Sequence, residues 1–174
     1  MNKILKSLGL LVLVLTVFTT FSCSSDDEDN TPAAKLVAGL YSGWTKGDCQ
    51  YFKNRTQNGE SVAISSNDDG TIDVKLTSQM WGETTIHGVK VEKTGNGFNL
   101  SGSGKFAMGM GDKQTDYDCN LTGTISADRK TYSIAFNMPA VMGGLTITFA
   151  QGEAPAEESV AGLKLRRSLA SANL

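Results

Sequence analysis

Three cysteines and one histidine are the residues of this 174-residue chain with the most reactive side chains. Cys49 and Cys119 remain as an even pair if Cys23 is used elsewhere, and such a pair in an exported protein predicts a disulfide. The bridge would close a loop of about 70 residues and add on the order of 4 kcal/mol of stability in the chain-entropy description. Two free buried thiols are the alternative. Two cysteines so far apart, with no histidine nearby, do not have zinc-ligand spacing.

The single histidine, His87, would have to serve any Ser-His-Asp arrangement, yet the chain has no Gly-x-Ser-x-Gly elbow. Its neighbours predict an exposed strand position. Gly102-Ser103-Gly104-Lys105 lacks the first glycine and the final hydroxyl of a phosphate-binding loop. Ser65–Asp73 partly resembles a calcium loop, but Leu76 stands where a bidentate Glu is required. We therefore expect no enzyme activity, no cofactor and no metal.

Aromatic side chains are the remaining candidates for binding. Exposed aromatic rings bind sugars and apolar ligands, whereas buried rings build a core, and the sequence leaves both interpretations open. The candidates are Trp44, Phe52, Trp81, Phe98 and Phe106.

The N-terminus has the features of an export signal. Lys3 and Lys6 precede an apolar stretch of about ten residues, which is too short to cross a membrane. Cys23 follows a small residue, Ser22, and resembles the cysteine of a bacterial lipobox, although Thr20 stands where Leu is usual. We predict a lipoprotein signal peptide over residues 1–22 and lipid attachment at Cys23, so that an N-terminal acyl anchor binds the membrane. An ordinary secretory signal followed by an incidental Cys is the alternative.

Residues 23–34 form the next segment, an acidic tether containing Asp26-Asp27-Glu28-Asp29. Four consecutive acids repel one another and bury no apolar area, which predicts a solvated spacer. Such a run after a lipobox cysteine resembles the signal that carries Bacteroidetes lipoproteins to the outer cell surface; retention on the periplasmic face is the alternative. From Thr31 onward the chain has 14 basic and 14 acidic residues, so we expect no nucleic-acid partner.

The body of the chain alternates apolar and polar residues with a period of two, which is typical of half-buried strands. Asn67-Asp68-Asp69-Gly70 predicts a tight hairpin between two such runs. The alternation slips by one residue at Gly88, which predicts a bulge or a bend. The apolar positions of the clearest runs are Phe98, Leu100, Phe106, Tyr117, Cys119, Leu121, Ile125, Tyr132, Ile134, Phe136, Met138, Leu145, Ile147 and Phe149.

About eight strands without intervening helices predict an all-β fold, an antiparallel closed or nearly closed barrel over residues 35–152. Eight strands leave an interior that side chains can fill or that can hold one small ligand. The inward glycines Gly102, Gly104 and Gly123 fit either internal space or strand bending. Residues 153–174 are expected to form a linker and a tail, with a short amphipathic helix from Val160 to Leu174 that either covers the barrel or frays.

Several separated segments together resemble the calycin-like β-barrel lipoproteins of Bacteroidetes, a lipocalin-related and largely uncharacterised family. The resemblance covers residues 35–155 and implies a closed barrel on a lipid anchor, without supplying catalytic or ligand-binding residues. The segments are AGLYSGWTKGDCQYF, MWGETTIHGVKV, SGSGKFAMGMGDK, YDCNLTGTIS and PAVMGGLTITFAQGEAP.

Two functions remain after the catalytic motifs are set aside. The first is a non-enzymatic outer-membrane binding module whose barrel accepts a small apolar or glycan-like ligand. The second is a structural or interaction lipoprotein whose barrel is packed solid and takes no small molecule.

Overall fold

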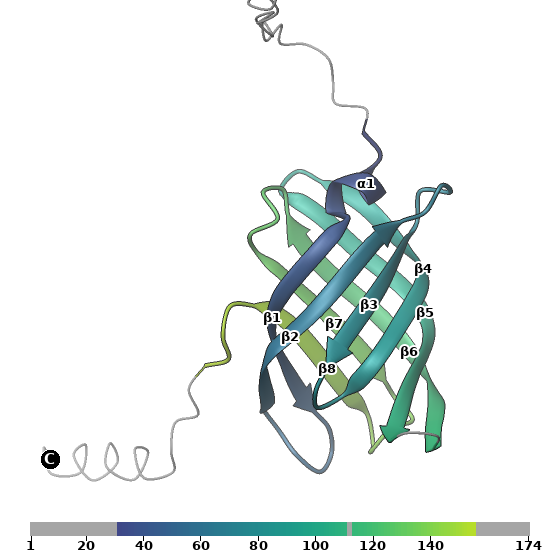
Figure 1. Cartoon of the computed structure of the whole chain (residues 1–174), viewed down its shortest axis with the longest axis vertical. Coiled ribbons are helices and arrows are strands. Elements are labelled where there is room, and N and C mark those ends of the chain that lie inside the picture. Colours follow the sequence, from purple (N-terminus) through teal and green to yellow (C-terminus); the bar gives the residue numbers. More distant parts are fainter. Residues whose placement is uncertain (1–30, 111–112, 156–174) are drawn as a thin grey trace, which may run out of the picture. The chain divides into compact units, whose positions relative to one another are not determined.

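The computed structural model describes residues 31–110 and 113–155, which fold into one short helix and an eight-stranded barrel (Figure 1). The predictions for the signal peptide, Cys23, residues 23–30 of the tether and the C-terminal helix therefore lie outside the described residues. No helix in the described ranges has the length and hydropathy of a membrane span. The elements are α1 (Ala33–Val37), β1 (Gly39–Asp48), β2 (Arg55–Ser66), β3 (Ile72–Ser78), β4 (Gly82–Thr94), β5 (Gly97–Met110), β6 (Lys113–Ser126), β7 (Tyr132–Met138) and β8 (Leu145–Gln151).

The strands form a closed antiparallel barrel in which each strand pairs with its neighbours in the sequence. β8 closes the barrel against β1, with Gly43 opposite Gln151 and Asp48 opposite Thr146. The predicted all-β architecture, its strand number and its closure are thus confirmed. The short helix α1 was not anticipated from the sequence.

The hairpin between β2 and β3 has the predicted turn. Gly70 has φ +82°, a left-handed conformation that glycine adopts without steric cost. The carboxylate of Asp69 accepts hydrogen bonds from the backbone N–H and the hydroxyl of Thr71. These bonds stabilise the negative charge and lower the pKa of Asp69.

The predicted bulge in β4 is present at Gly88, which has φ +66°. Ile72 pairs with Val89 whereas Val74 pairs with Ile86, so β4 carries one extra residue between these two pairs. A second bulge interrupts the pairing of β1 and β2: Gly43 lies opposite Glu60, but Trp44 lies opposite Asn58. Gly59, with φ +75°, is the extra residue.

α1 packs at one end of the barrel. Ala34 and Val37 are buried, and the hydroxyl of Tyr41 donates a hydrogen bond of 2.6 Å to the carbonyl of Val37. Burial raises the pKa of that hydroxyl. The loop between β1 and β2 lies at the opposite end of the barrel, which we call the loop end (Figure 1).

Candidate functional site

The interior of the barrel is filled by its own side chains. Many inward side chains have no accessible surface, so no space large enough for a water molecule borders them. The rings of Phe106 and Phe136 meet edge to face, with centroids 5.8 Å apart. Side chains with zero accessible surface include Val62, Ile72, Val74, Leu76, Ile86, Val89, Phe106, Leu121, Ile134, Phe136, Met138, Leu145, Ile147 and Phe149.

The inward glycines provide further evidence of a filled interior. A Cβ added to Gly102 would lie 2.9 Å from Cγ2 of Val89, and one added to Gly104 would lie 3.2 Å from Cγ2 of Ile86. The side chains of β4 therefore occupy the room that these glycines leave. We conclude that the glycines permit close packing between strands and do not create a ligand cavity.

The five candidate aromatic residues occupy three different environments. Phe98, Phe106 and Trp81 are buried in the core. Phe52 is half-buried at the loop end, where its ring stacks on Trp81 at a centroid distance of 6.2 Å. Trp44 lies on the outer face of β1, half-buried, and its indole N–H donates a 3.0 Å hydrogen bond to the carbonyl of Gln151. Only Trp44 presents its ring to the outer surface of the sheet.

Trp81 belongs to a buried polar cluster at the loop end. Its indole N–H donates a hydrogen bond of 3.0 Å to the hydroxyl of Thr45, and its backbone N–H donates one to the hydroxyl of Ser78. A Cβ on Gly47 would lie 2.3 Å from the Trp81 ring, so the ring rests directly on the backbone of β1. These contacts assign Trp81 to the packing of this end of the barrel.

Glu60 is a buried carboxylate that neither motif nor periodicity indicated. Only 2% of the residue is exposed, and its Oε1 accepts a hydrogen bond of 3.1 Å from the backbone N–H of Gln79. Oε2 accepts no hydrogen bond from any described residue. The backbone pairing of β2 with β3 ends at Ser61 and Thr77. Beyond this pair, the Glu60 side chain accepts the hydrogen bond from the turn between β3 and β4. The sequence indicates the burial of Glu60 only through its spacing, because Glu60 stands two residues before Val62, an apolar strand position.

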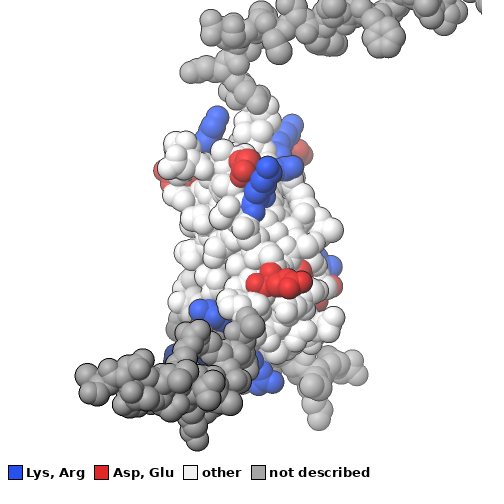
Figure 2. All heavy atoms as spheres, turned by 90° about the vertical axis from the view of Figure 1, so that its left-hand side faces the viewer, with Lys and Arg blue, Asp and Glu red and all other residues white. Residues whose placement is uncertain are grey.

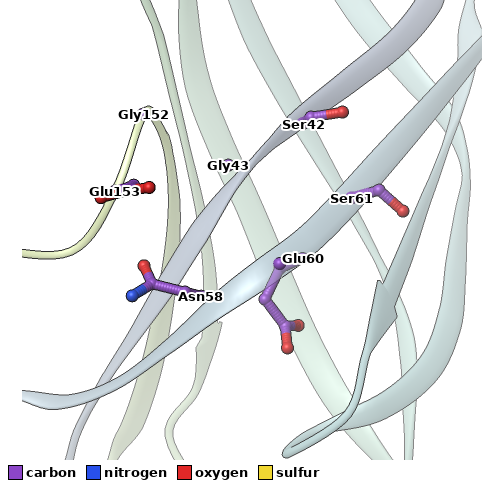
Figure 3. A pocket seen from close by; sticks show the side chains of 8 residues that line it. Ser42, Gly43, Asn58, Glu60, Ser61, Gly152 and Glu153 are labelled. Atoms are coloured by element: carbon purple, nitrogen blue, oxygen red, sulfur yellow. The ribbon is translucent and has the colours of Figure 1, made fainter.

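A hollow lies outside the barrel, over the bulge between β1 and β2 (Figure 3). It has a volume of about 390 Å³, and we call it the bulge pocket. Its polar side chains carry hydroxyl, amide and carboxylate groups, and no Lys, Arg or His among the described residues lines it. The lining residues are Ser42, Gly43, Asn58, Gly59, Glu60, Ser61, Gly152 and Glu153.

The segment after β8 forms one wall of the bulge pocket. Gly152, with φ +79°, turns the chain away from the direction of β8. The backbone N–H of Ala154 then donates a hydrogen bond of 2.8 Å to Oδ1 of Asn58, on β2. In Figure 3 the side chains of Asn58 and Glu153 lie on the same side of the pocket, whereas the Glu60 side chain points away from Glu153. The floor is tight, because a Cβ on Gly43 would lie 2.0 Å from the carbonyl oxygen of Ala150.

A second, smaller hollow of about 240 Å³ lies beside the upper part of β1, where β8 has ended. Arg129, with φ +58°, donates hydrogen bonds from Nη1 to the carbonyls of Leu36 and Ala38, at 3.4 and 3.0 Å. The hydroxyl of Tyr132 donates to the carbonyl of Ser42. These side chains bind backbone carbonyls at and just before the start of β1, beyond the last pair of the β1–β8 ladder.

The predicted disulfide is wrong for this structure: Cys49 and Cys119 are both buried free thiols, the alternative considered above. The sulfur of Cys49 accepts a hydrogen bond of 3.3 Å from the backbone N–H of Tyr51. Cys119 lies on the inner face of β6, where burial raises its pKa to about 11. Each thiol therefore serves as a small core side chain.

His87 occupies the exposed strand position that the sequence indicated, with 74% of its side chain accessible. Its Nδ1 lies 2.7 Å from Oδ2 of Asp73, and Asp73 is the only described residue to which its side chain is hydrogen-bonded. Hydrogen bonds from Asn67, followed by those of His87 and Gly88, lower the pKa of Asp73. Within residues 31–110 and 113–155, no three His, Cys, Asp or Glu residues form a group that could hold a metal.

Comparison with known proteins gives a family and one solved relative. Residues 37–151 match the family model described as a calycin-like beta-barrel domain. A crystal structure of a "putative outer membrane protein" from Bacteroides fragilis superposes with a TM-score of 0.59 at 37% sequence identity, covering 70% of this chain and 46% of that one. The chain therefore spans about half the length of that relative. A comparison with curated proteins gives no match. The barrel described above and the extent of the matched region agree, and the chain belongs to the calycin-like β-barrel family.

Proposed function

We propose that the protein is a non-enzymatic, lipid-anchored binding module of the outer membrane that recognises a small glycan-like ligand on the outside of its barrel. The packing of the interior is the observation that carries this proposal, because the described core side chains leave no room for an apolar ligand among them. The bulge pocket offers the alternative site, and its polar lining suits a hydroxyl-rich ligand better than an apolar one.

Trp44 and the bulge pocket together supply the two elements that sugar recognition needs. The indole offers an apolar surface on which a sugar ring can stack. Trp44 follows the pocket residue Gly43 in β1 and pairs with the pocket residue Asn58 in β2. Hydroxyl groups of Ser42 and Ser61 and the carboxylate of Glu153 can donate to or accept from sugar hydroxyls.

Glycan binding by the full-length lipoprotein in detergent, measured by calorimetric titration against a set of neutral disaccharides, tests the site. We expect Trp44→Ala to abolish binding of whichever sugar binds. Tyr51→Ala is the control, because Tyr51 is an aromatic residue with 75% of its surface accessible that lies away from the pocket, after the loop end of β1. Equal loss in both variants, or none in Trp44→Ala, would contradict the proposed site.

The lipid anchor and the orientation are tested in cells. Cys23→Ser should move the protein from the membrane fraction to the soluble fraction, and unchanged membrane association would contradict the anchor. External protease should degrade the wild-type protein on intact cells if it faces outward. Protection until the outer membrane is permeabilised would instead support the periplasmic alternative.

A second function, recognition of a protein partner by a solid barrel without a small-molecule ligand, is favoured by the same filled interior. It predicts that no neutral sugar binds the wild-type protein and that cross-linking on cells recovers a defined protein partner.

A further inference from the structure

The sequence contains two Asn–Gly pairs, Asn58-Gly59 and Asn96-Gly97, and the fold places them in contrasting surroundings. Asparagine is chemically labile, and a following glycine increases this lability because no Cβ shields its backbone nitrogen. That nitrogen can attack the side-chain amide of the preceding asparagine. In a folded protein, the reaction depends on how closely the surroundings allow the two groups to approach.

Gly59 is the extra residue of the bulge between β1 and β2. In the strand register, Asn58 and Glu60 each have a residue opposite on β1, whereas Gly59 has none. Gly59 has φ +75°, and a Cβ built on it would meet no atom within 4 Å. Both Asn58 and Gly59 are exposed. The peptide between them therefore has room to rotate toward the Asn58 side chain.

Gly97 is held much more tightly. It is buried at the start of β5, where it pairs with Thr94 on β4 and with Ser126 on β6. A Cβ on Gly97 would collide with the carbonyl oxygen of Ile125, so the backbone of β6 packs directly against it. The second Asn–Gly pair thus has the same chemical groups without the same freedom, and it provides a reference within the same molecule.

The side-chain amide of Asn58 is also polarised by a hydrogen bond. The backbone N–H of Ala154 donates to its Oδ1 at 2.8 Å. In Figure 3 the Asn58 side chain extends from β2 toward the segment that follows β8. Attack on Cγ of Asn58 places negative charge on this same oxygen, so the donor from Ala154 stabilises the charge as it develops.

We propose that Asn58 is a site of spontaneous deamidation, which gives the bulge pocket a further carboxylate. Solvent base removes the proton of the Gly59 N–H, and the nitrogen forms a bond to Cγ of Asn58. The bond between Cγ and Nδ2 breaks, and ammonia leaves. Water then opens the cyclic imide. Cleavage between the imide nitrogen and Cγ gives aspartate, whereas cleavage between the nitrogen and the backbone carbonyl carbon gives isoaspartate.

Either product changes the bulge pocket. Glu60 and Glu153 already line it, and no Lys, Arg or His in the described part of the chain does so. Figure 2 shows the side from which the segment after β8 leaves the barrel, where white surface predominates, so one added charge is a large local change. Isoaspartate also adds one carbon to the backbone of β2 opposite Trp44. The inference does not depend on the proposed function, although either product alters the site proposed there.

The test follows both asparagines in the same sample. The full-length protein in detergent is incubated at mildly alkaline pH, and peptide mapping by mass spectrometry measures aspartate and isoaspartate at positions 58 and 96. A second sample is incubated in guanidinium chloride. We expect Asn58 to convert roughly tenfold or more faster than Asn96 in the folded protein, a difference of about 1.4 kcal/mol in activation free energy. In guanidinium chloride the two should convert at similar rates.

Ala154→Pro removes the N–H that binds Oδ1 of Asn58, at a position beyond the end of β8 at Gln151. It should slow conversion of Asn58 by roughly tenfold and leave Asn96 unchanged. Ala154→Gly is the matched control, because it keeps the N–H, and it should retain the wild-type rate. Circular dichroism and thermal melts of both variants check the fold.

Equal conversion of Asn58 and Asn96 in the folded protein would overturn the inference. It would also be overturned if Asn58 stayed intact in the folded protein over the time in which the unfolded chain converts it. An unchanged or faster rate in Ala154→Pro would overturn the role assigned to the Ala154 N–H.

Discussion

Replacing Glu60 by Gln is expected to stabilise the protein. Oε1 of Glu60 accepts the N–H of Gln79, and a glutamine carbonyl can preserve this bond. Oε2 has no partner among the described residues and is shielded from water. Burying an unpaired charge costs several kcal/mol, whereas a buried amide left without a partner costs about 1–3 kcal/mol. The difference predicts a gain of about 1–3 kcal/mol for Glu60→Gln.

Equilibrium unfolding in urea at neutral pH, supported by thermal melts, measures this gain. For a barrel of this size, each kcal/mol corresponds to a melting-temperature shift of about 3–6 °C. Glu60→Ala also leaves the N–H of Gln79 without its acceptor, so it should be less stable than Glu60→Gln by at least about 1–3 kcal/mol. Glu83→Gln is the control, because Glu83 is exposed and its ion pair with Lys75 contributes at most about 1 kcal/mol.

The refuting result is a Glu60→Gln protein that is less stable than the wild type by more than about 1 kcal/mol. It would show that Oε2 has a favourable partner in solution, and the argument from an unpaired buried charge would be wrong. A gain of the expected size would instead mark Glu60 as a residue retained at a cost to stability, which is typical of positions kept for function.

Three other substitutions or conditions test the packing, the thiols and the acid response. Phe136→Ala should lower the free energy of unfolding in urea by about 3–5 kcal/mol, because it removes a fully buried ring from the centre of the core; Leu40→Ala, at an exposed position, should change it by less than about 0.5 kcal/mol. Cys49 and Cys119 should resist iodoacetamide at neutral pH and react only after unfolding, because both are buried and the pKa of Cys119 is raised to about 11; an intact mass short of two hydrogens under non-reducing conditions would instead show a disulfide. Asp73 has a folded pKa below its unfolded value of about 3.9, so its stabilising contribution is present above that pH and is lost as the pH falls through the folded pKa. Asp73→Asn should therefore weaken the fall in the free energy of unfolding at acid pH. An unchanged fall would contradict the hydrogen bonds assigned to the Asp73 carboxylate.

The strands could be predicted because inward and outward residues differ in polarity over most of the barrel. The bulge at Gly88 was predictable for the same reason, since apolar residues on both sides reveal the change of phase. The bulge at Gly59 left no such trace, because Gln57, Asn58 and Glu60 around it are all polar.

The candidate site was harder to predict than the fold. The inward residues of β1 beyond Tyr41 are small or polar, among them Gly43, Thr45 and Gly47. The alternation of apolar and polar residues is therefore missing from this part of β1, and the sequence did not show that Trp44 points outward. The pairing of Cys49 with Cys119 depends on geometry that a count of cysteines does not contain. Whether the interior is hollow depended on how Val89 and Ile86 fill the room beside two glycines.

The incomplete ladder between β1 and β8 has a consequence for colloidal behaviour. A bare strand edge is a template on which another polypeptide can add, and this is a common route to fibres and precipitates. Beside the upper half of β1, the guanidinium of Arg129 and the phenol of Tyr132 already engage the carbonyls of Ala38 and Ser42. Those two carbonyls are therefore unavailable to an added strand, which helps the barrel to remain dispersed at high protein concentration.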